Sequence, residues 1–188
     1  MIIASMMIAW VGLGGCQPGS AGSLDPVAAP GVERVDDEIW SHAAIINEGP
    51  VSARIVGRWS SERSQTLRVS YRNNGKATVR IDVTKLKMAH PSGDAVLRTA
   101  VDATGVNMTD AREDNDAPRM LYLVDKPTIY SPVMEIGPGQ TRDLDSSFTV
   151  FSNDGVVAEG NRVSAAVPMP AGPRSIAFTL ASRSILTF

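Results

Sequence analysis

The sequence predicts an all-β protein, with one antiparallel sandwich domain built from short strands. Apolar and polar residues alternate with a period of two along much of the chain after residue 51. Clusters of Pro, Gly, Asn and Asp separate these runs at short intervals, as turns separate the strands of a sandwich. Aromatic residues make up only 5% of the 188 residues, so Val, Ile, Leu, Ala and Met must supply the core. At this length one domain is expected, stable without disulfides or a structural metal.

The first element of the domain has two interpretations. Asp36 is a suitable N-cap for a short helix that would run to Ile46 and end near Gly49. The alternative is that Ile45 and Ile46 lead into a first strand. The sequence alone does not decide between them.

The clearest period-two pattern covers residues 66–83 and is interrupted by Asn73-Asn74-Gly75. Such a turn sequence between two alternating runs predicts a β-hairpin. A two-residue loop would place Val69 opposite Arg80, whereas a three-residue loop pairs Val69 with Val79 and keeps one face apolar. We therefore expect a three-residue turn with Gly75 in the left-handed region, forming a bulge.

The remaining elements follow from shorter signals. The apolar phase shifts at Thr84-Lys85, which predicts a kink there. Turns are expected at residues 91–94, 137–140 and 171–173. Strands are expected at residues 95–101, 120–124 and 147–151, and around Val163 and Ile176. This spacing favours an antiparallel sandwich over alternating strands and helices.

The layout of hairpin, polar loops and a late strand after a Pro-Gly turn resembles bacterial immunoglobulin-like sandwich domains. The paired cysteines of antibody domains are absent, because Cys16 is the only cysteine of the chain. The resemblance implies an immunoglobulin-like β-sandwich. A short helix near the start of the domain is one of the two interpretations of residues 36–46 given above. The resemblance implies no function by itself, because such folds carry many functions.

Residues 1–15 form a charge-free, largely apolar run that ends in Leu13-Gly14-Gly15-Cys16. The run is shorter than the roughly 20 apolar residues that a transmembrane helix needs, and its length suits an export signal. This segment resembles the lipobox of bacterial lipoproteins. The resemblance implies that residues 1–15 are removed and that Cys16 carries fatty acyl chains such as palmitate. The alternative is a buried first element with Cys16 as an ordinary core thiol.

The residues after Cys16 are typical of a tether. Residues 17–23 and the Pro and Gly residues up to Gly31 favour an extended chain over packing. We therefore expect three segments, namely a signal peptide at 1–15, an anchor with a flexible linker at 16–35, and a β-sandwich domain at 36–188. Gln17 resembles the sorting position of outer-membrane lipoproteins, which implies a periplasm-facing location on that membrane.

Residues suited to catalysis are scarce. The only histidines are His42 and His90, no Gly-x-Ser-x-Gly nucleophile elbow occurs, and the single cysteine is assigned to lipid. His90 precedes the turn residue Pro91 and is expected at the surface. Two histidines without a free thiol do not make a zinc site, and the methionines are expected to fill the core rather than bind copper. We therefore expect neither enzymatic activity nor a cofactor.

An acidic stretch offers a calcium hypothesis. Asp110, Asp114 and Asp116 provide hard oxygen ligands of the kind that Ca²⁺ prefers. Arg112 lies within the same stretch, and the Gly and distal Glu of an EF-hand loop are missing. A solvated loop is therefore the simpler interpretation, with a weak calcium site as the alternative.

A second candidate surface depends on the predicted hairpin. Its register would align Arg68, Arg72, Lys76 and Arg80 on one polar face. Such a basic face could bind phosphates of lipopolysaccharide or an acidic protein, although a solvated sheet face explains it as well. The net charge of −2 gives no reason to expect a nucleic-acid partner.

Together these features indicate a lipid-anchored, periplasmic binding or scaffold lipoprotein, an accessory subunit of a cell-envelope complex. Its expected partners are the membrane, through the anchor, and an envelope protein. The alternative is an envelope module that binds a small ligand, a glycan or a metal.

Overall fold

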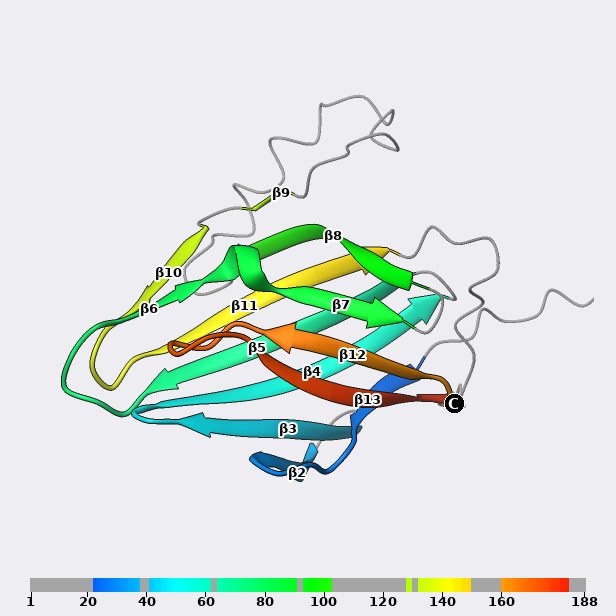
Figure 1. The fold of residues 1–188 in the computed structure, drawn as a ribbon, viewed down its shortest axis with the longest axis horizontal. Helices are drawn as coiled ribbons and strands as arrows, with labels where there is room; N and C mark the ends of the chain where they lie inside the picture. Colours follow the sequence, from blue (N-terminus) through cyan, green and yellow to red (C-terminus); the bar gives the residue numbers. More distant parts are fainter. Residues whose placement is uncertain are drawn as a thin grey trace, which may run out of the picture.

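The computed structural model describes residues 22–37, 41–61, 64–90, 93–102, 128–129, 132–149 and 160–182. These residues form an all-β, sandwich-like fold, which confirms the predicted fold class (Figure 1). Strand pairs in the described part are antiparallel except for β8 and β9, which run parallel. The only helix assigned there is a single 3-10 turn.

The strands follow the chain in the order β1 (Gly22–Pro26), β2 (Val32–Asp37), β3 (Ser41–Glu48), β4 (Val51–Ser61), β5 (Ser64–Asn73), β6 (Val79–Asp82), β7 (Lys87–His90), β8 (Gly93–Asp102), β9 (Thr128–Ile129), β10 (Val133–Ile136), β11 (Thr141–Thr149), β12 (Arg162–Val167) and β13 (Arg174–Ser182). The 3-10 turn η1 (Val83–Lys85) lies between β6 and β7.

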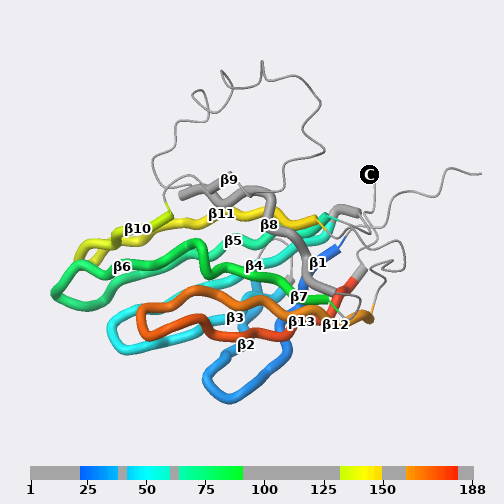
Figure 2. The backbone as a smooth tube through the Cα atoms, turned by 45° about the horizontal axis from the view of Figure 1, so that its top comes forward, coloured from blue at the N-terminus to red at the C-terminus, as the bar shows by residue number. Residues whose placement is uncertain are grey.

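The main sheet closes on itself. Its strands follow the order β1, β13, β12, β7, β8, β11, β5, β4, β3 and β2, and β1 pairs with both β13 and β4. The path from β1 through β13 to β4 is therefore a hydrogen-bonded ring, flattened into two layers (Figure 2). The β2–β3 hairpin continues the sheet beyond β4, and β6 with β10 forms a separate two-stranded sheet.

The core lies between the two layers. Inward positions alternate with outward ones, as in β5, whose inward-facing Leu67, Val69 and Tyr71 are all essentially buried. The Tyr71 hydroxyl donates to the Pro168 carbonyl over 2.9 Å, which satisfies the buried polar group. Burial raises the pKa of Tyr71 well above its usual range. The largest fully buried side chains include Trp59, Tyr71, Phe148 and Phe178.

Several predicted elements are confirmed. β12 and β13 occur where the alternation indicated, with Val163 and Ile176 facing inward. The kink at Thr84-Lys85 is the turn η1, whose N-cap Asp82 accepts hydrogen bonds from the Thr84 hydroxyl and backbone N–H. The hydrogen bond from the Thr84 hydroxyl lowers the pKa of Asp82.

The predicted hairpin of residues 66–83 is wrong. Val69 pairs with Ile55 of β4 and Leu144 of β11, whereas Val79 pairs with Ile136 of β10. Both edges of β5 are thus occupied by the long strands β4 and β11. These strands can form many more backbone hydrogen bonds with β5 than the four residues of β6 could. Gly75 does not adopt a positive φ, so the expected bulge is wrong as well. The prediction paired β5 with the segment that follows it in the chain. Its partners are instead the preceding strand β4 and the distant strand β11.

The predicted N-terminal helix and the extent of the linker are also wrong. Residues 41–48 form β3, as the strand alternative proposed, with Ala43, Ala44 and Ile46 buried. Within the expected linker 16–35, residues 22–26 form β1 and fully bury Leu24. A Cβ on Gly22 would lie 1.8 Å from the Ala181 carbonyl oxygen, so this glycine permits close packing rather than flexibility. The fold therefore includes residues of the expected linker, from Gly22 on, rather than only residues from Asp36 on.

Candidate functional site

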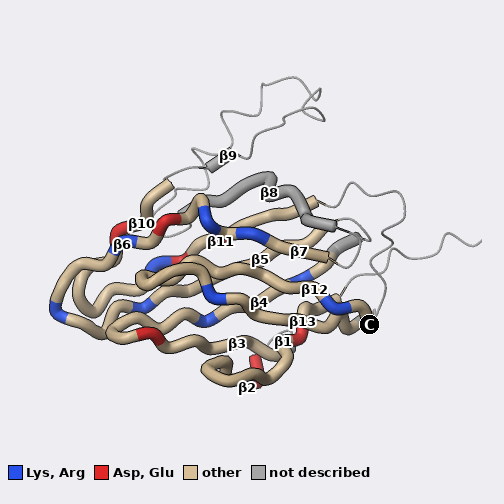
Figure 3. Tube along the Cα trace, in the orientation of Figure 1, with Lys and Arg blue, Asp and Glu red and all other residues tan. Residues whose placement is uncertain are grey.

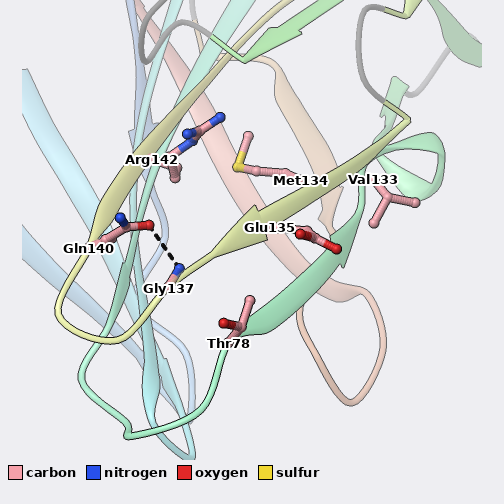
Figure 4. A pocket seen from close by; sticks show the side chains of 7 residues that line it. All are labelled: Thr78, Val133, Met134, Glu135, Gly137, Gln140 and Arg142. Atoms are coloured by element: carbon pink, nitrogen blue, oxygen red, sulfur yellow. Dashed lines mark hydrogen bonds between the residues drawn. The ribbon is translucent and has the colours of Figure 1, made fainter.

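A hollow lies where β10 and β11 diverge from their connecting turn at residues 137–140 (Figure 4). It is an open groove of about 530 Å³. Val133, Met134 and Glu135 of β10 form one side, and Gln140 with Arg142 forms the other. Gly137 of the turn and Thr78, just before β6, complete it.

The chemistry of the turn explains the groove. The Gln140 N–H donates to the Gly137 carbonyl over 3.1 Å, Pro138 occupies the second position, and Gly139 has a φ of 70°. This combination is typical of a type II turn. Type II turns splay the strands that they connect, because their twist does not match that of a hairpin. β10 therefore pairs with β6, while β11 pairs with β5.

Gln140 reinforces the turn with its side chain, whose Oε1 accepts a hydrogen bond from the Gly137 N–H over 2.9 Å. The sequence predicted a turn at residues 137–140 but not the groove beside it. The Pro138-Gly139 pair was the available signal, since Pro followed by Gly is typical of a type II turn.

Asn73 braces the floor of the same region. Its side chain is fully buried, and Nδ2 donates to the carbonyls of Ala77 and Ile136 over 2.7 and 2.9 Å. Its Oδ1 accepts from the Gly75 N–H over 2.9 Å. One amide therefore ties the β5–β6 connection to the end of β10, and the residue that seemed to mark a hairpin tip instead links two sheets.

The side chains that border the groove include apolar and charged groups. Val133 is 50% exposed, unusual for a large apolar side chain in this molecule. Glu135 forms an exposed ion pair with Arg80 of β6, with Nε to Oε1 at 2.9 Å. Among the described residues that line the groove there is no histidine and no pair of carboxylates. The exposed apolar side chain of Val133 lies beside the carboxylate of Glu135, and Arg142 adds a positive charge on the opposite side.

The predicted row of basic residues does not form. Arg68 binds both carboxylate oxygens of Asp145 on β11, at 2.7 and 2.9 Å, and this hydrogen bonding raises the pKa of Arg68. Arg80 lies in the other sheet and pairs with Glu135. Arg72 is an exposed residue of β5, and Lys76 lies in the connection to β6. Figure 3 shows Lys and Arg scattered over many strands rather than gathered on one face.

His42 belongs to a charged surface cluster. Its Nδ1 lies 3.2 Å from Asp25 Oδ2, and its Nε2 lies 3.3 Å from Asp36 Oδ1. Arg34 also approaches Asp25, with 3.8 Å between NH2 and Oδ2. These side chains come from β1, β2 and β3, so the cluster holds the β2–β3 hairpin against β1. His42 lies beside carboxylates but lines neither the groove at 137–140 nor a smaller one near Val32.

His90 is buried, contrary to the expected surface position. Its Nε2 lies 3.1 Å from Oε1 of the equally buried Gln65, and burial lowers the pKa of His90. The β7–β8 pairing, in which His90 lies opposite Gly93, draws the imidazole inward. Met88, Met134 and Met169 fill the core, as predicted for methionines in this chain.

The remaining predicted sites lie outside the described residues. These are Cys16 and the acidic stretch with Asp110, Asp114 and Asp116. In the described ranges, no three His, Cys, Asp or Glu side chains gather closely enough to hold a metal ion. No helix in that part of the chain has the length and hydropathy of a membrane span.

Comparisons with known proteins assign no family. No protein-family model matches the chain, and neither the curated proteins nor the solved structures gave a match.

Proposed function

We propose that the protein is a lipid-anchored, non-enzymatic binding or scaffold lipoprotein on the periplasmic side of the outer membrane. It would serve as an accessory subunit of a cell-envelope complex. The anchor is the acylated Cys16 that follows the apolar segment and Leu13-Gly14-Gly15. The observation that carries the proposal is this lipobox-like sequence, with Cys16 six residues before β1.

The short spacing limits how far β1 can lie from the membrane. Gly22 follows Cys16 by six residues, which span at most about 20 Å when fully extended. Gly22 pairs with Ser182 at the end of β13 and with Trp59 of β4, so this end of the domain is held near the membrane. More than one acyl chain makes such anchoring stable.

The groove lies at the other end of the molecule. In Figure 1, β13 ends at the right, and the turn between β10 and β11 lies at the left, along the longest axis. An anchor at one end and an open groove at the other suit a protein that presents a docking surface to the periplasm.

Small-ligand binding is the second candidate. The groove volume of about 530 Å³ lies within the range of ligand pockets. However, exposed side chains such as Val133 and Glu135 border it, so it would cover little of a small molecule's surface. An extended partner segment fits these features better.

The proposal is tested in intact Gram-negative cells that express the full chain or the variant Cys16→Ser. The wild-type protein should fractionate with the outer membrane and crosslink to an envelope protein, whereas Cys16→Ser should lose both. Equal fractionation and equal crosslinking of the two chains would contradict the proposal. The envelope protein is then identified by mass spectrometry and confirmed by reciprocal crosslinking.

A further inference from the structure

The edge of β10 that faces away from β6 carries backbone groups with no strand partner in the described residues. The Val83 N–H donates to the Pro132 carbonyl over 2.9 Å, which makes this a hydrogen-bonded pair in the β6–β10 register. In antiparallel strands such pairs alternate, so Met134 and Ile136 direct their backbone groups toward β6. Val133 and Glu135 direct theirs toward the groove.

The opposite side of the groove is also a strand edge. The Asn73 N–H donates to the Gln140 carbonyl over 3.0 Å, so the backbone groups of Gln140 point toward β5. The backbone N–H and carbonyl of Thr141 therefore point away from β5. The pairing of β11 with β8 begins only at Leu144. Over its first residues β11 therefore has β5 on one side and the groove on the other.

The side chains beside the β10 edge define what would complement it. Val133 offers an exposed apolar surface, and Glu135 lies two positions along on the same face. Both contacts of Arg80 are made with Oε1 of Glu135, at 2.9 and 2.8 Å, and neither involves Oε2. An incoming strand could therefore place a second cation against this carboxylate.

We propose that the β10 edge binds an extended segment of a partner protein by β-strand addition. The segment would carry an apolar and a basic side chain two positions apart, so that both lie on one face, the former beside Val133 and the latter beside Glu135. Main-chain hydrogen bonds give affinity in this mode of recognition, and alternate side chains give specificity. This inference rests on the proposed function, because it names the kind of partner that a binding module would take.

A second copy of the chain fits the edge less well. Antiparallel pairing of two β10 edges about Met134 would place Val133 opposite Glu135 of the other copy, so no opposite charges would meet. A basic partner segment supplies that charge.

The test uses the full chain purified in mild detergent and the fluorescent octapeptide Thr-Val-Thr-Lys-Thr-Val-Thr-Lys, in which Val and Lys lie two positions apart on one face of the strand. We expect saturable binding in fluorescence anisotropy. Val133→Pro should weaken it at least about tenfold, because Pro removes the N–H that faces the groove but none that faces β6. Val133→Thr keeps that N–H and should bind within about twofold of the wild type. Urea unfolding of both variants verifies the fold.

Charge is tested separately. Glu135→Gln should weaken binding of the Lys peptide by about threefold, and the matching peptide with Glu in place of Lys should not bind. Absence of saturable binding, or equal binding by Val133→Pro, would overturn the inference. A dimer that Val133→Pro abolishes would overturn it too, since the occupant would then be a second copy. Membrane fractionation of Cys16→Ser is independent of these outcomes, so failure here leaves the proposed function to be judged by that experiment.

Discussion

The side chain of Asn73 makes three hydrogen bonds while fully buried: two to the nearby Gly75 and Ala77, and one to Ile136 of the distant β10. From the sequence, Asn73-Asn74-Gly75 is indistinguishable from a hairpin tip, because Asn and Gly also favour tight turns. What distinguishes the two roles is the acceptor on β10, Ile136, which lies 63 residues away in the chain. No local pattern reports such a contact.

The first prediction concerns this brace. Asn73→Ala should lower the free energy of unfolding by about 2–4 kcal/mol, because it leaves the buried carbonyl of Ile136 and the N–H of Gly75 without their side-chain partner. Urea denaturation monitored by circular dichroism measures the change. Asn74→Ala is the matched control, since its side chain is exposed, and should change stability by about 0.5 kcal/mol or less. Equal effects of the two substitutions would show that Asn73 is not a brace.

His90 gives a prediction about pH. Burial lowers its pKa in the folded state, so the unfolded chain, with a histidine pKa near 6.5, binds more protons below that pH. The contribution of His90 to stability is therefore fully present above about pH 7.5. It is lost as the pH falls through 6.5 toward the folded-state pKa.

The measurement is the free energy of unfolding of the wild type and of His90→Gln between pH 8 and pH 5. The wild-type curve should fall more steeply, by at most about 1.4 kcal/mol per pH unit. His42 is common to both chains and cancels in the comparison. Parallel curves would show that the imidazole is not desolvated in the fold.

At the scale of the elements, the alternation of apolar and polar residues predicts where strands lie in the sequence. It does not predict which strands pair with one another. β12 and β13 are neighbours in sequence and space, and their alternation predicted both correctly. β5 pairs with β11 from far along the chain, and β6 pairs with β10 in a separate sheet. The groove arises from this separation, which is why the sequence did not predict it.

Shortening the chain at β1 tests whether residues 22–26 belong to the fold. A chain shortened to begin at Gly22 should be as stable as the full chain, whereas one shortened to begin after Pro26 should be strongly destabilised. The latter loses Leu24 from the core and opens the pairing of β1 with β13 and β4. Urea midpoints compare the two chains.

If the shorter chain fails to fold, Leu24→Ala in the full chain replaces it. This substitution should cost about 2–5 kcal/mol, as large-to-small changes in a packed core do. Unchanged stability in both tests would mean that residues 22–26 are a tether after all, as the Gly, Ser and Pro content suggested.

At the scale of the whole molecule, Gly22 and the groove lie toward opposite ends of the fold, and the proposed anchor would hold the Gly22 end nearer the bilayer. A fluorophore at Arg58→Cys, opposite Ser23, should therefore lie nearer the bilayer than one at Lys76→Cys, in the β5–β6 connection. Energy transfer to a membrane dye should be more efficient from position 58. Equal transfer, or more from position 76, would contradict the orientation.

The most direct test of the lipid anchor is the mass of the N-terminal peptide of the protein purified from membranes of a Gram-negative host. We expect a peptide that begins at Cys16 and carries two or three fatty acyl chains. A peptide that retains residues 1–15, or one that begins at Cys16 without added lipid, would contradict the anchor on which the proposed function depends.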